Sequence, residues 1–213
     1  MKFIVISDTH FKHHDLELPQ ADAIIHAGDI SATGAKPEIE QFIDWFSHLN
    51  YKYKIFIAGN HDFYLEEISH TEQEKEFIPE SVIYLNDSGI TIEGIQLWGS
   101  PVQPKFWNWA FNRRRGEEIK KHWDLIPEET NILITHGPPY EILDHTVTNE
   151  HAGCRDLLYK VNLIKPAYHV FGHIHGAYGK KEKRGIQFIN ASLLDENYSR
   201  KNKPVVFEYT PKS

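Results

Sequence analysis

The sequence predicts a layered α/β fold in which two sheets pack together and helices cover their outer faces. Short apolar runs rich in Ile and Val alternate with segments of helical periodicity, and hairpin signals occur in the middle and near the end of the chain. With 213 residues, of which 40% are hydrophobic, the chain is long enough for a substantial core. We therefore expect one α/β domain spanning residues 1–213.

Five short apolar runs predict strands that are buried on both faces, because they are rich in β-branched residues. In chain order they are residues 2–7, 21–27, 54–58, 131–135 and 168–171. Apolar residues at helical spacing predict helices over residues 36–49, 114–126 and 154–165. Pro127 and Pro166 stand just beyond the last two helices, where a proline is expected.

Two further regions predict antiparallel strands. Within residues 82–100, an Asp-Ser-Gly at 87–89 and a Glu-Gly at 93–94 interrupt strand-forming runs, so we expect hairpins at both turns. Residues 178–192 and 204–209 predict two or three antiparallel strands near the end of the chain.

The charge balance excludes some classes of protein. The net charge of −7, from 23 basic and 30 acidic residues, argues against a dedicated nucleic-acid-binding protein, which usually carries a basic surface.

The lone cysteine, Cys154, excludes an internal disulfide. The first residues read as a strand rather than a signal peptide, and no segment approaches 18 apolar residues, so we expect a cytoplasmic protein without a membrane partner.

Asp, Asn or His residues directly follow each of the five predicted strands. In chain order these residues are Asp8, His10, Asp29, Asn60, His61, Asp62, His136, His173 and His175. In open α/β sheets, ligands bind outside the carboxyl ends of the strands, so five neighbouring strands would bring these residues together. Gly28, Gly59, Gly137 and Gly172 accompany them and allow sharp turns and close approach to a ligand.

The set without His61 and Asp62 offers two carboxylates, one amide oxygen and four imidazoles. Imidazole with carboxylate suits Mn, Fe, Zn, Co or Ni. Seven donors are too many for one tetrahedral ion but fit two ions that share a bridging carboxylate. Paired ions about 3.5–4 Å apart act in phosphoryl transfer and hydrolysis. Each motif alone fits an ordinary turn, but their conjunction at five strand ends predicts a functional site.

In order, the motifs Asp-x-His, Gly-Asp, Gly-Asn-His-Asp, His and Gly-His-x-His resemble the pattern of the calcineurin-like metallophosphoesterases. The stretches WGSPVQP, NWAFNRRRGEE and FINASLLDENY resemble a small branch of that family, the metallophosphoesterase-domain-containing proteins. The similarity runs from Phe3 to about Tyr209. It implies a sandwich of two mixed β-sheets flanked by helices.

The resemblance also implies the roles of the individual residues. A first metal would be held by Asp8, His10 and His175, a second by Asn60, His136 and His173, with Asp29 bridging the two. Manganese is the favoured ion. His61 would not bind metal but would donate a proton or place a positive charge near the phosphate. Ala32 stands where protein phosphatases carry an Asp, and Asp62 replaces a Glu, which argues against a protein phosphatase.

The implied reaction is the hydrolysis of a small-molecule phosphodiester, with cyclic nucleotides, and 2′,3′-cyclic phosphates above all, as the favoured substrates. A hydroxide held between the metals would attack phosphorus while His61 assists the leaving group. Two alternatives stay open, a nuclease acting on nucleic-acid phosphodiesters and a non-catalytic scaffold on the same fold. Asp62 reads equally well as a support for the site and as a turn carboxylate.

Other side chains near these motifs have ordinary interpretations as well as functional ones. Aromatic residues at the expected mouth could stack a nucleotide base, although such clusters more often form core: Phe106, Trp107, Trp109 and Phe111. His26 reads as a core residue or a support for the site. The remaining histidines read as surface or packing residues: His13, His14, His48, His70, His122, His145, His151 and His169.

Overall fold

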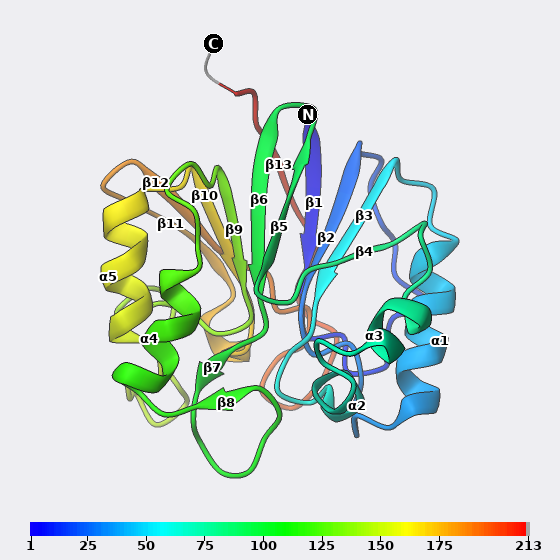
Figure 1. Ribbon diagram of the computed structural model, residues 1–213, viewed down its shortest axis with the longest axis horizontal. Coiled ribbons are helices and arrows are strands. Elements are labelled where there is room, and N and C mark those ends of the chain that lie inside the picture. Colours follow the sequence, from blue (N-terminus) through cyan, green and yellow to red (C-terminus); the bar gives the residue numbers. More distant parts are fainter. Residues whose placement is uncertain (212–213) are drawn as a thin grey trace.

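The computed structural model describes residues 1–211. Two β-sheets face each other in the middle of the molecule, and helices cover their outer faces (Figure 1). The layers therefore run helix, sheet, sheet, helix. The predicted fold class, with two mixed sheets flanked by helices, is confirmed.

The first sheet has five strands in the order β13-β1-β2-β3-β4. Their bounds are β1 (Lys2–Ile6), β2 (Ala23–Ala27), β3 (Tyr53–Ile57), β4 (Ile83–Tyr84) and β13 (Val205–Glu208). β1 to β4 are mutually parallel, and β13 pairs antiparallel with β1 at the edge. The carboxyl ends of the parallel strands therefore all point the same way.

The second sheet has six strands in the order β11-β12-β10-β9-β6-β5. Their bounds are β5 (Ser88–Ile92), β6 (Ile95–Ser100), β9 (Ile132–Thr135), β10 (Tyr168–Phe171), β11 (Gly179–Lys183) and β12 (Ile186–Asn190). The four central strands are parallel, while β11 and β5 pair antiparallel at the edges. A short two-stranded sheet, β7 (Gln103–Pro104) with β8 (Asn112–Arg113), lies at the lower end of the molecule in Figure 1.

Helices cover the outer face of each sheet (Figure 1). On the side of the first sheet are α1 (Lys36–Ser47), α2 (Phe63–Glu67) and α3 (Glu72–Phe77), and on the side of the second are α4 (Glu117–Asp124) and α5 (Arg155–Ile164). α1 buries Ile39, Phe42, Ile43 and Phe46, the apolar stripe that its periodicity predicts. Within residues 1–211, no helix is both long enough and apolar enough to cross a membrane.

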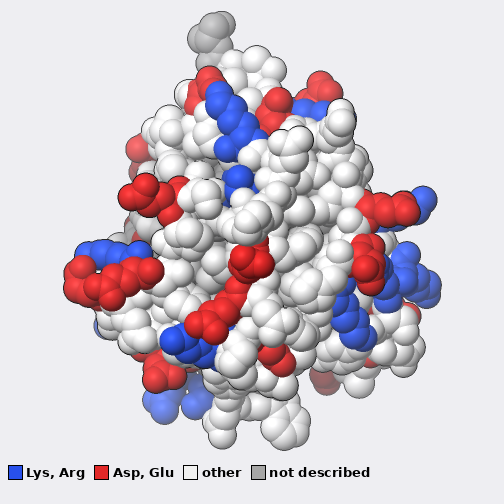
Figure 2. All heavy atoms as spheres, turned by 90° about the vertical axis from the view of Figure 1, so that its right-hand side faces the viewer, with Lys and Arg blue, Asp and Glu red and all other residues white. Residues whose placement is uncertain are grey.

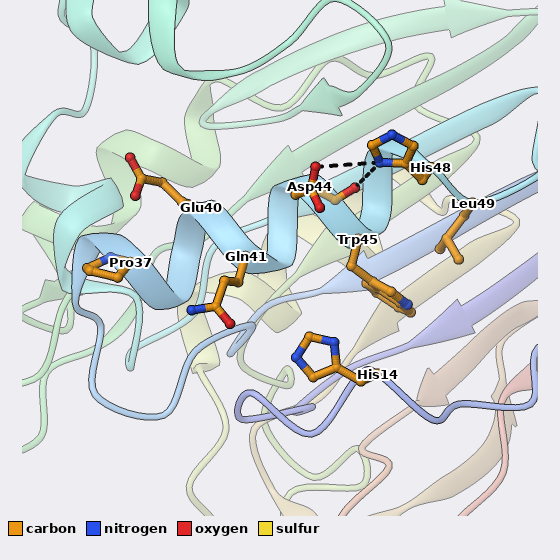
Figure 3. A pocket seen from close by; sticks show the side chains of 8 residues that line it. All are labelled: His14, Pro37, Glu40, Gln41, Asp44, Trp45, His48 and Leu49. Carbon is orange, nitrogen blue, oxygen red and sulfur yellow. Dashed lines mark hydrogen bonds and ion pairs between the residues drawn. The ribbon is translucent and has the colours of Figure 1, made fainter.

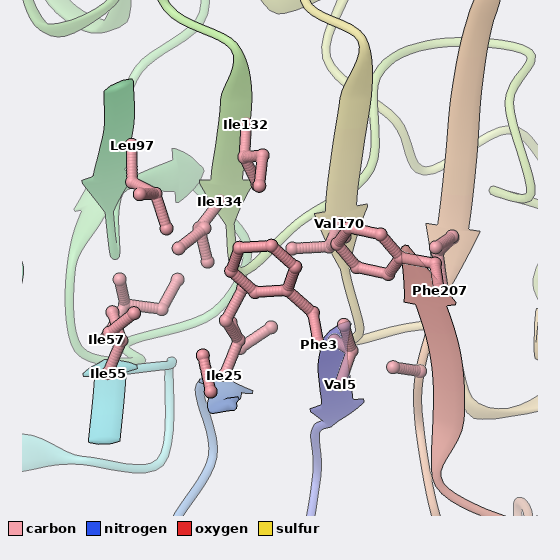
Figure 4. Packing of buried hydrophobic residues seen from close by; sticks show 14 of the residues in the cluster. Phe3, Val5, Ile25, Ile55, Ile57, Leu97, Ile132, Ile134, Val170 and Phe207 are labelled. Carbon is pink, nitrogen blue, oxygen red and sulfur yellow. The ribbon is translucent and has the colours of Figure 1, made fainter. Parts of the chain in front are cut away.

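The core between the sheets is apolar. Figure 4 shows Phe3, Val5, Ile25, Ile55, Ile57 and Phe207 of the first sheet packed against Leu97, Ile132, Ile134 and Val170 of the second. The strands of both sheets carry these side chains on their inner faces, which is why the runs read as buried strands. Phe3 and Phe207, from opposite ends of the chain, stack with ring centroids 5.0 Å apart.

The expectation that the five strands are all neighbours is wrong. β1, β2 and β3 lie in the first sheet, whereas β9 and β10 lie in the second. Backbone hydrogen bonds join the two sheets where these strands end: Ser7 N–H donates to Ala191 O at 3.0 Å, and Leu193 N–H donates to Ser7 O at 3.0 Å. The two sets of carboxyl ends therefore converge at a seam between the sheets.

The hairpin predicted at residues 87–89 is also wrong. β4 pairs with β3 in the first sheet and β5 pairs with β6 in the second, so the segment between them crosses from one sheet to the other. Asp87 turns the chain there in a left-handed conformation (φ 45°). Its carboxylate accepts hydrogen bonds from Ser100 Oγ and His122 Nδ1, both at 2.6 Å, which hold the crossing in place. The hairpins β5–β6 and β11–β12 are confirmed.

Gly99 of β6 lies where the two sheets close on each other. A Cβ atom at this position would collide with Leu85 Cβ and lie 2.7 Å from Ile57 Cγ2. We expect Gly99→Ala to lower the free energy of unfolding by about 1–3 kcal/mol, because it overpacks a filled core. Urea denaturation checks this. Gly94→Asn is the control, since nothing lies within 4 Å of a Cβ there and Asn tolerates a positive φ. Equal stability of the two variants would contradict the prediction.

Candidate metal centre

The polar residues that follow the five strands meet at one end of the molecule. This is the lower end in Figure 1, where β1, β2, β3, β9 and β10 finish. The structure brings together all of the predicted metal-binding side chains there: Asp8, His10, Asp29, Asn60, His136, His173 and His175. Most of them are buried in the protein although they are polar or charged. Such groups need partners, so the contacts among them decide what the cluster can bind.

Asp8, His10 and His175 form the first group of donor atoms. His175 Nε2 lies 3.4 Å from Asp8 Oδ1 and 3.2 Å from His10 Nε2. The other oxygen of Asp8 accepts hydrogen bonds from Ser192 Oγ at 2.8 Å and from the backbone N–H of His173 at 3.0 Å. Two ring nitrogens that face each other at 3.2 Å need a proton or a cation between them, because two lone pairs repel.

Asp29, Asn60, His136 and His173 form the second group. His136 Nε2 lies 2.9 Å from Asn60 Oδ1, and the rings of His136 and His173 have centroids 5.0 Å apart. Asp29 Oδ2 lies 3.4 Å from His136 Nε2 and 3.6 Å from His10 Nε2 in the first group. One carboxylate oxygen therefore faces both groups.

Backbone carbonyls orient two of the imidazoles. His136 Nδ1 lies 2.9 Å from Ala27 O, and His175 Nδ1 lies 2.9 Å from Asp195 O. A carbonyl oxygen accepts only from N–H, so the proton sits on Nδ1 in each ring and Nε2 is left for the centre. This arrangement is typical of histidines that bind metal ions.

The backbone is strained where it carries these side chains. Four of the residues have left-handed φ values without being glycine: Asp8 (54°), His10 (40°), Asp29 (57°) and His173 (69°). Such conformations are uncommon outside glycine, and they concentrate at functional sites, where surrounding contacts hold them. Contacts between the loops supply this support, for example the hydrogen bond from Asp8 N–H to Gly28 O at 3.0 Å.

Two glycines allow the loops to come this close together. A Cβ atom on Gly59 would collide with Asp29 Oδ1 and lie 2.7 Å from His136 Cε1. A Cβ atom on Gly172 would collide with Asp8 Oδ2 and Ser7 Oγ. The glycines predicted to allow close approach are thus required because functional side chains fill the space beside them.

Burial and mutual charge pull the pKa values of these groups apart. Burial opposes ionisation of Asp8, but the hydrogen bond to His175 and the nearby imidazoles hold the pKa of its carboxyl well below its usual range. Burial also opposes ionisation of Asp29, yet His136 lowers its pKa. Against the effect of burial, the two carboxylates raise the pKa of His136 and of His175 to about 9.

The residues present fit a pair of divalent cations. The donors are imidazole, carboxylate and amide oxygen, which Mn, Fe, Zn, Co and Ni accept. Protons on His136 and His175 occupy the places that cations would take, so binding of metal ions would release protons. A proton on His175 likewise explains the contact between His10 Nε2 and His175 Nε2, and a cation bound by both nitrogens would take its place.

His61 lies beside the cluster with its ring held from two sides. Its Nδ1 lies 2.8 Å from Ala32 O, so this carbonyl takes the place of the Asp that the sequence lacks. The ring stacks on Trp109, with centroids 4.3 Å apart and planes at 29°. A ring nitrogen of His61 lies within 4.8 Å of donor atoms of His10 and Asp29. His61 thus borders both groups.

Asp62 ties two of the loops together. Its buried carboxylate accepts hydrogen bonds from the backbone N–H groups of Gly59 (2.7 Å), Ile30 (3.3 Å) and Ser31 (3.0 Å), and from Ser31 Oγ (2.6 Å). Burial and the charge of Asp29 nevertheless raise its pKa to about 6. Both interpretations of Asp62 hold, since it is a turn carboxylate that also positions the loops of the cluster.

Two residues at the cluster were not predicted. Ser192 donates to Asp8, as described above, and Tyr198 lies edge-on to His10 and His175, with ring centroids 4.9 and 5.2 Å away. Both belong to the stretch FINASLLDENY. The resemblance of that stretch to the family branch could have indicated them. The strand pattern could not, because no apolar run ends there in a histidine or an acid.

The aromatic residues predicted near the mouth divide into core and surface. Phe111 is 1% exposed and packs in the core beneath α1, as the ordinary interpretation predicts. Trp107 is 83% exposed, so the core interpretation is wrong for it. Phe106 lies edge-on to His173, with ring centroids 5.2 Å apart, and Trp109 lies beside Phe106 at 6.4 Å. An aromatic rim therefore borders one side of the cluster.

Two surface cavities differ in their relation to the cluster. A surface cavity of about 740 Å³ lies along α1, where His48 pairs with Asp44 (Figure 3), and none of the predicted site residues line it. A smaller cavity of about 220 Å³ adjoins the cluster and is lined in part by His173, His175 and Tyr198.

Sequence comparison places the chain among known proteins. The family model for calcineurin-like phosphoesterases matches residues 1–177. Metallophosphoesterase domain-containing protein 1 of Homo sapiens is 37% identical over 235 residues, covering 100% of this chain and 72% of that protein. A UPF0046 protein of Caenorhabditis elegans is 36% identical over 223 residues, covering 100% of this chain and 76% of that protein.

Solved structures share the fold. The phosphopantetheinyl hydrolase of Mycobacterium tuberculosis superposes with a TM-score of 0.63 at 15% identity, covering 92% of this chain and 90% of the other. A second crystal structure has a TM-score of 0.71 at 16% identity, covering 98% of this chain and 99% of the other. At these identities the likeness shows the fold alone.

The predicted cluster, from Asp8 to His175, lies inside the segment that the family model matches. The resemblance found in the motifs is confirmed along the full chain by the human relative. The chain belongs to the calcineurin-like phosphoesterase family, whose members are dinuclear-metal-dependent hydrolases of phosphoester bonds.

Proposed function

We propose that the chain is a binuclear-metal-dependent phosphodiesterase that acts on small phosphodiesters. The observation that carries this proposal is the position of Asp29, whose Oδ2 faces His10 on one side and His136 on the other. A carboxylate shared by two cations must have this placement. Two cations about 3.5–4 Å apart can clamp a phosphate between them. Family membership carries the coarser statement that this is a metal-dependent phosphoesterase.

The two groups of donor atoms would each hold one cation. We assign Asp8, His10 and His175 to the first and Asn60, His136 and His173 to the second, with Asp29 shared, and manganese is the favoured ion. When bound, such a pair neutralises charge on the phosphate and lowers the pKa of a water molecule. The side chains themselves keep Nε2 of His136 and His175 directed inward and exclude solvent from the carboxylates.

We assign His61 to proton transfer. Ala32 O fixes Nδ1, so Nε2 is the ring atom left to donate a proton to the leaving oxygen. Stacking on Trp109, with ring centroids 4.3 Å apart, limits rotation of the ring. A positioned acid of this kind contributes about 10²–10⁴-fold to the rate.

We propose a cyclic nucleotide as the substrate, with a 2′,3′-cyclic phosphate favoured. The indole of Trp107 contributes little to the fold at 83% exposure and is available to a planar base. Stacking of a base on an aromatic side chain is worth about 1–3 kcal/mol. The similarity to the metallophosphoesterase-domain-containing branch supports a small phosphoester.

Charge supports a small substrate over a nucleic acid. The net charge is −7, and Figure 2 shows acidic and basic side chains interspersed on the face that carries α1 to α3. A nuclease would bind through several phosphate contacts and lose affinity steeply with added salt. Weak salt dependence of substrate binding is therefore expected here.

We also propose that residues 1–213 form a single domain. Strands from both ends of the chain, β1 and β13, are neighbours in the first sheet. The stacked rings of Phe3 and Phe207 place both ends in the same core, which supports this proposal.

Removal of metal ions should abolish activity. We expect chelation to eliminate hydrolysis of a chromogenic phosphodiester and added Mn²⁺ to restore it. Asp29→Asn should lower activity at fixed Mn²⁺ by at least about 100-fold, because loss of even a supporting residue costs 10- to 100-fold. Asp44→Asn on α1, an exposed carboxylate, is the control. Activity that survives both chelation and Asp29→Asn would sink the two-metal assignment.

His61→Ala should lower kcat on an alkyl phosphodiester by about 10²–10⁴-fold while the protein keeps its metal ions. The loss should be smaller on an aryl ester, whose leaving oxygen needs no proton. Steady-state kinetics on the two esters, with metal content measured in parallel, checks this. His70→Ala, at an exposed position away from the cluster, serves as the control. Wild-type turnover of the alkyl ester would rule out the acid role.

Trp107→Ala should raise KM for a cyclic nucleotide by about 5- to 150-fold, the equivalent of 1–3 kcal/mol of stacking. KM for a small alkyl phosphodiester should stay near the wild-type value, because that substrate has no base to stack. Tyr159→Ala on α5 removes an aromatic ring of similar exposure, 70%, far from the rim and is the control. Equal changes in KM for both substrates would show that Trp107 does not bind a base.

A further inference from the structure

A second group of metal-ligand side chains lies outside the candidate centre. Donor atoms of Asp144, His145 and His151 all lie within 4.8 Å of one another. His145 and His151 face each other across an antiparallel bridge, and their rings have centroids 4.1 Å apart. None of the three belongs to the set around Asp29. The sequence interpretation left both histidines as surface or packing residues.

The carboxylate of Asp144 is buried and cannot turn away from the histidines. Its Oδ2 accepts hydrogen bonds from the backbone N–H groups of Glu141 at 2.9 Å and Gly153 at 3.1 Å. Its Oδ1 lies 2.9 Å from His151 Nδ1. A buried carboxylate that is fixed on one oxygen presents the other to whatever occupies the space beside the two rings.

The loop that carries the histidines is already closed by its own hydrogen bonds. Ala152 N–H donates to Asp144 O at 3.0 Å, Thr146 N–H donates to Glu150 O at 3.0 Å, and Asn149 N–H donates to Thr146 O at 2.9 Å. A cation would therefore not have to order this segment, and the entropy lost on binding would be small.

We propose that Asp144, His145 and His151 form a third metal site, separate from the binuclear centre and suited to Zn²⁺. Two imidazoles and one carboxylate are the protein ligands of several zinc sites that keep an open fourth position. Ligand bonds of about 2.0–2.2 Å place tetrahedral donors about 3.4 Å apart. The exposed rings of His145 and His151 reach that spacing by small rotations, while Asp144 stays in place.

The site adjoins the mouth of the candidate centre. Thr146 and Val147, at the tip of the same loop, line the cavity of about 220 Å³ together with His175 and Tyr198. A cation held at the base of the loop would fix the position of that wall. Zinc at the third site would thus act on the shape of the cavity without contacting the phosphate.

Zinc loading of matched variants tests the proposal. Each metal-free protein is loaded with Zn²⁺ alone, separated from free ion by gel filtration, and analysed for bound zinc. We expect the wild type to bind one Zn²⁺ per chain more than the His145→Gln/His151→Gln protein. The control, His48→Gln/His70→Gln, removes two exposed histidines elsewhere and should bind as much zinc as the wild type. Equal zinc content in the wild type and the first variant would overturn the proposal.

The same pair of substitutions in an Asp29→Asn background separates this site from the binuclear centre. A difference of one Zn²⁺ per chain should persist there, because the third site shares no ligand with that centre. If the difference disappears in this background, the histidines affect zinc only through the binuclear centre and the third site does not exist.

Discussion

The buried carboxylate of Asp29 is the group on which the rest of the site depends. Its Oδ2 faces an imidazole of each group, and its Oδ1 accepts the backbone N–H of His61 at 2.8 Å. Burial alone would favour the neutral acid, but His136 outweighs that effect and holds the pKa of Asp29 low. An ionised carboxylate enclosed by four imidazoles and a second carboxylate is unstable without cations or protons beside it. This requirement ties the electrostatics of the site to the binding of metal ions.

The architecture places that carboxylate by joining two sheets at one end. β1 ends at Ile6, and the backbone of the next residue, Ser7, pairs with residues on both sides of Ser192, so the ends of the two sheets are joined there. Loops from five strands then share a small volume, which only glycine at positions such as Gly59 and Gly172 can accommodate. The left-handed backbone at Asp8, His10, Asp29 and His173 is the conformational cost of this convergence. Hydrogen bonds that the Asp62 carboxylate accepts from the backbone N–H groups of Gly59 and Ser31 offset part of it.

Two sides of the cluster carry different surroundings. Trp109 and Phe106 border one side, while the exposed Trp107 lines a separate cavity beside Trp109. The loop that contains His145 and His151 borders the cavity of about 220 Å³ on another side. His61 lies between the metal-binding groups and the aromatic rim, near His10 and Asp29 and stacked on Trp109. The residues proposed for metal binding and those of the proposed zinc site are therefore separate sets.

The sequence by itself determined the five central strands, the main helices and the acidic, amide and histidine residues of the cluster, because these depend on local pattern, but it did not indicate Ser192 or Tyr198. An apolar run that ends in Gly and Asp or His is visible in sequence wherever its strand lies in the fold. Tertiary structure alone decided that β9 and β10 belong to a different sheet from β1, β2 and β3, since strand pairing depends on contacts between distant segments. It also decided that residues 85–87 cross between sheets, that Ala32 O replaces a missing carboxylate, and that Trp107 is exposed while Phe111 is buried. Burial and hydrogen-bond partners of this kind are set by neighbours remote along the chain, so no local pattern could have predicted them.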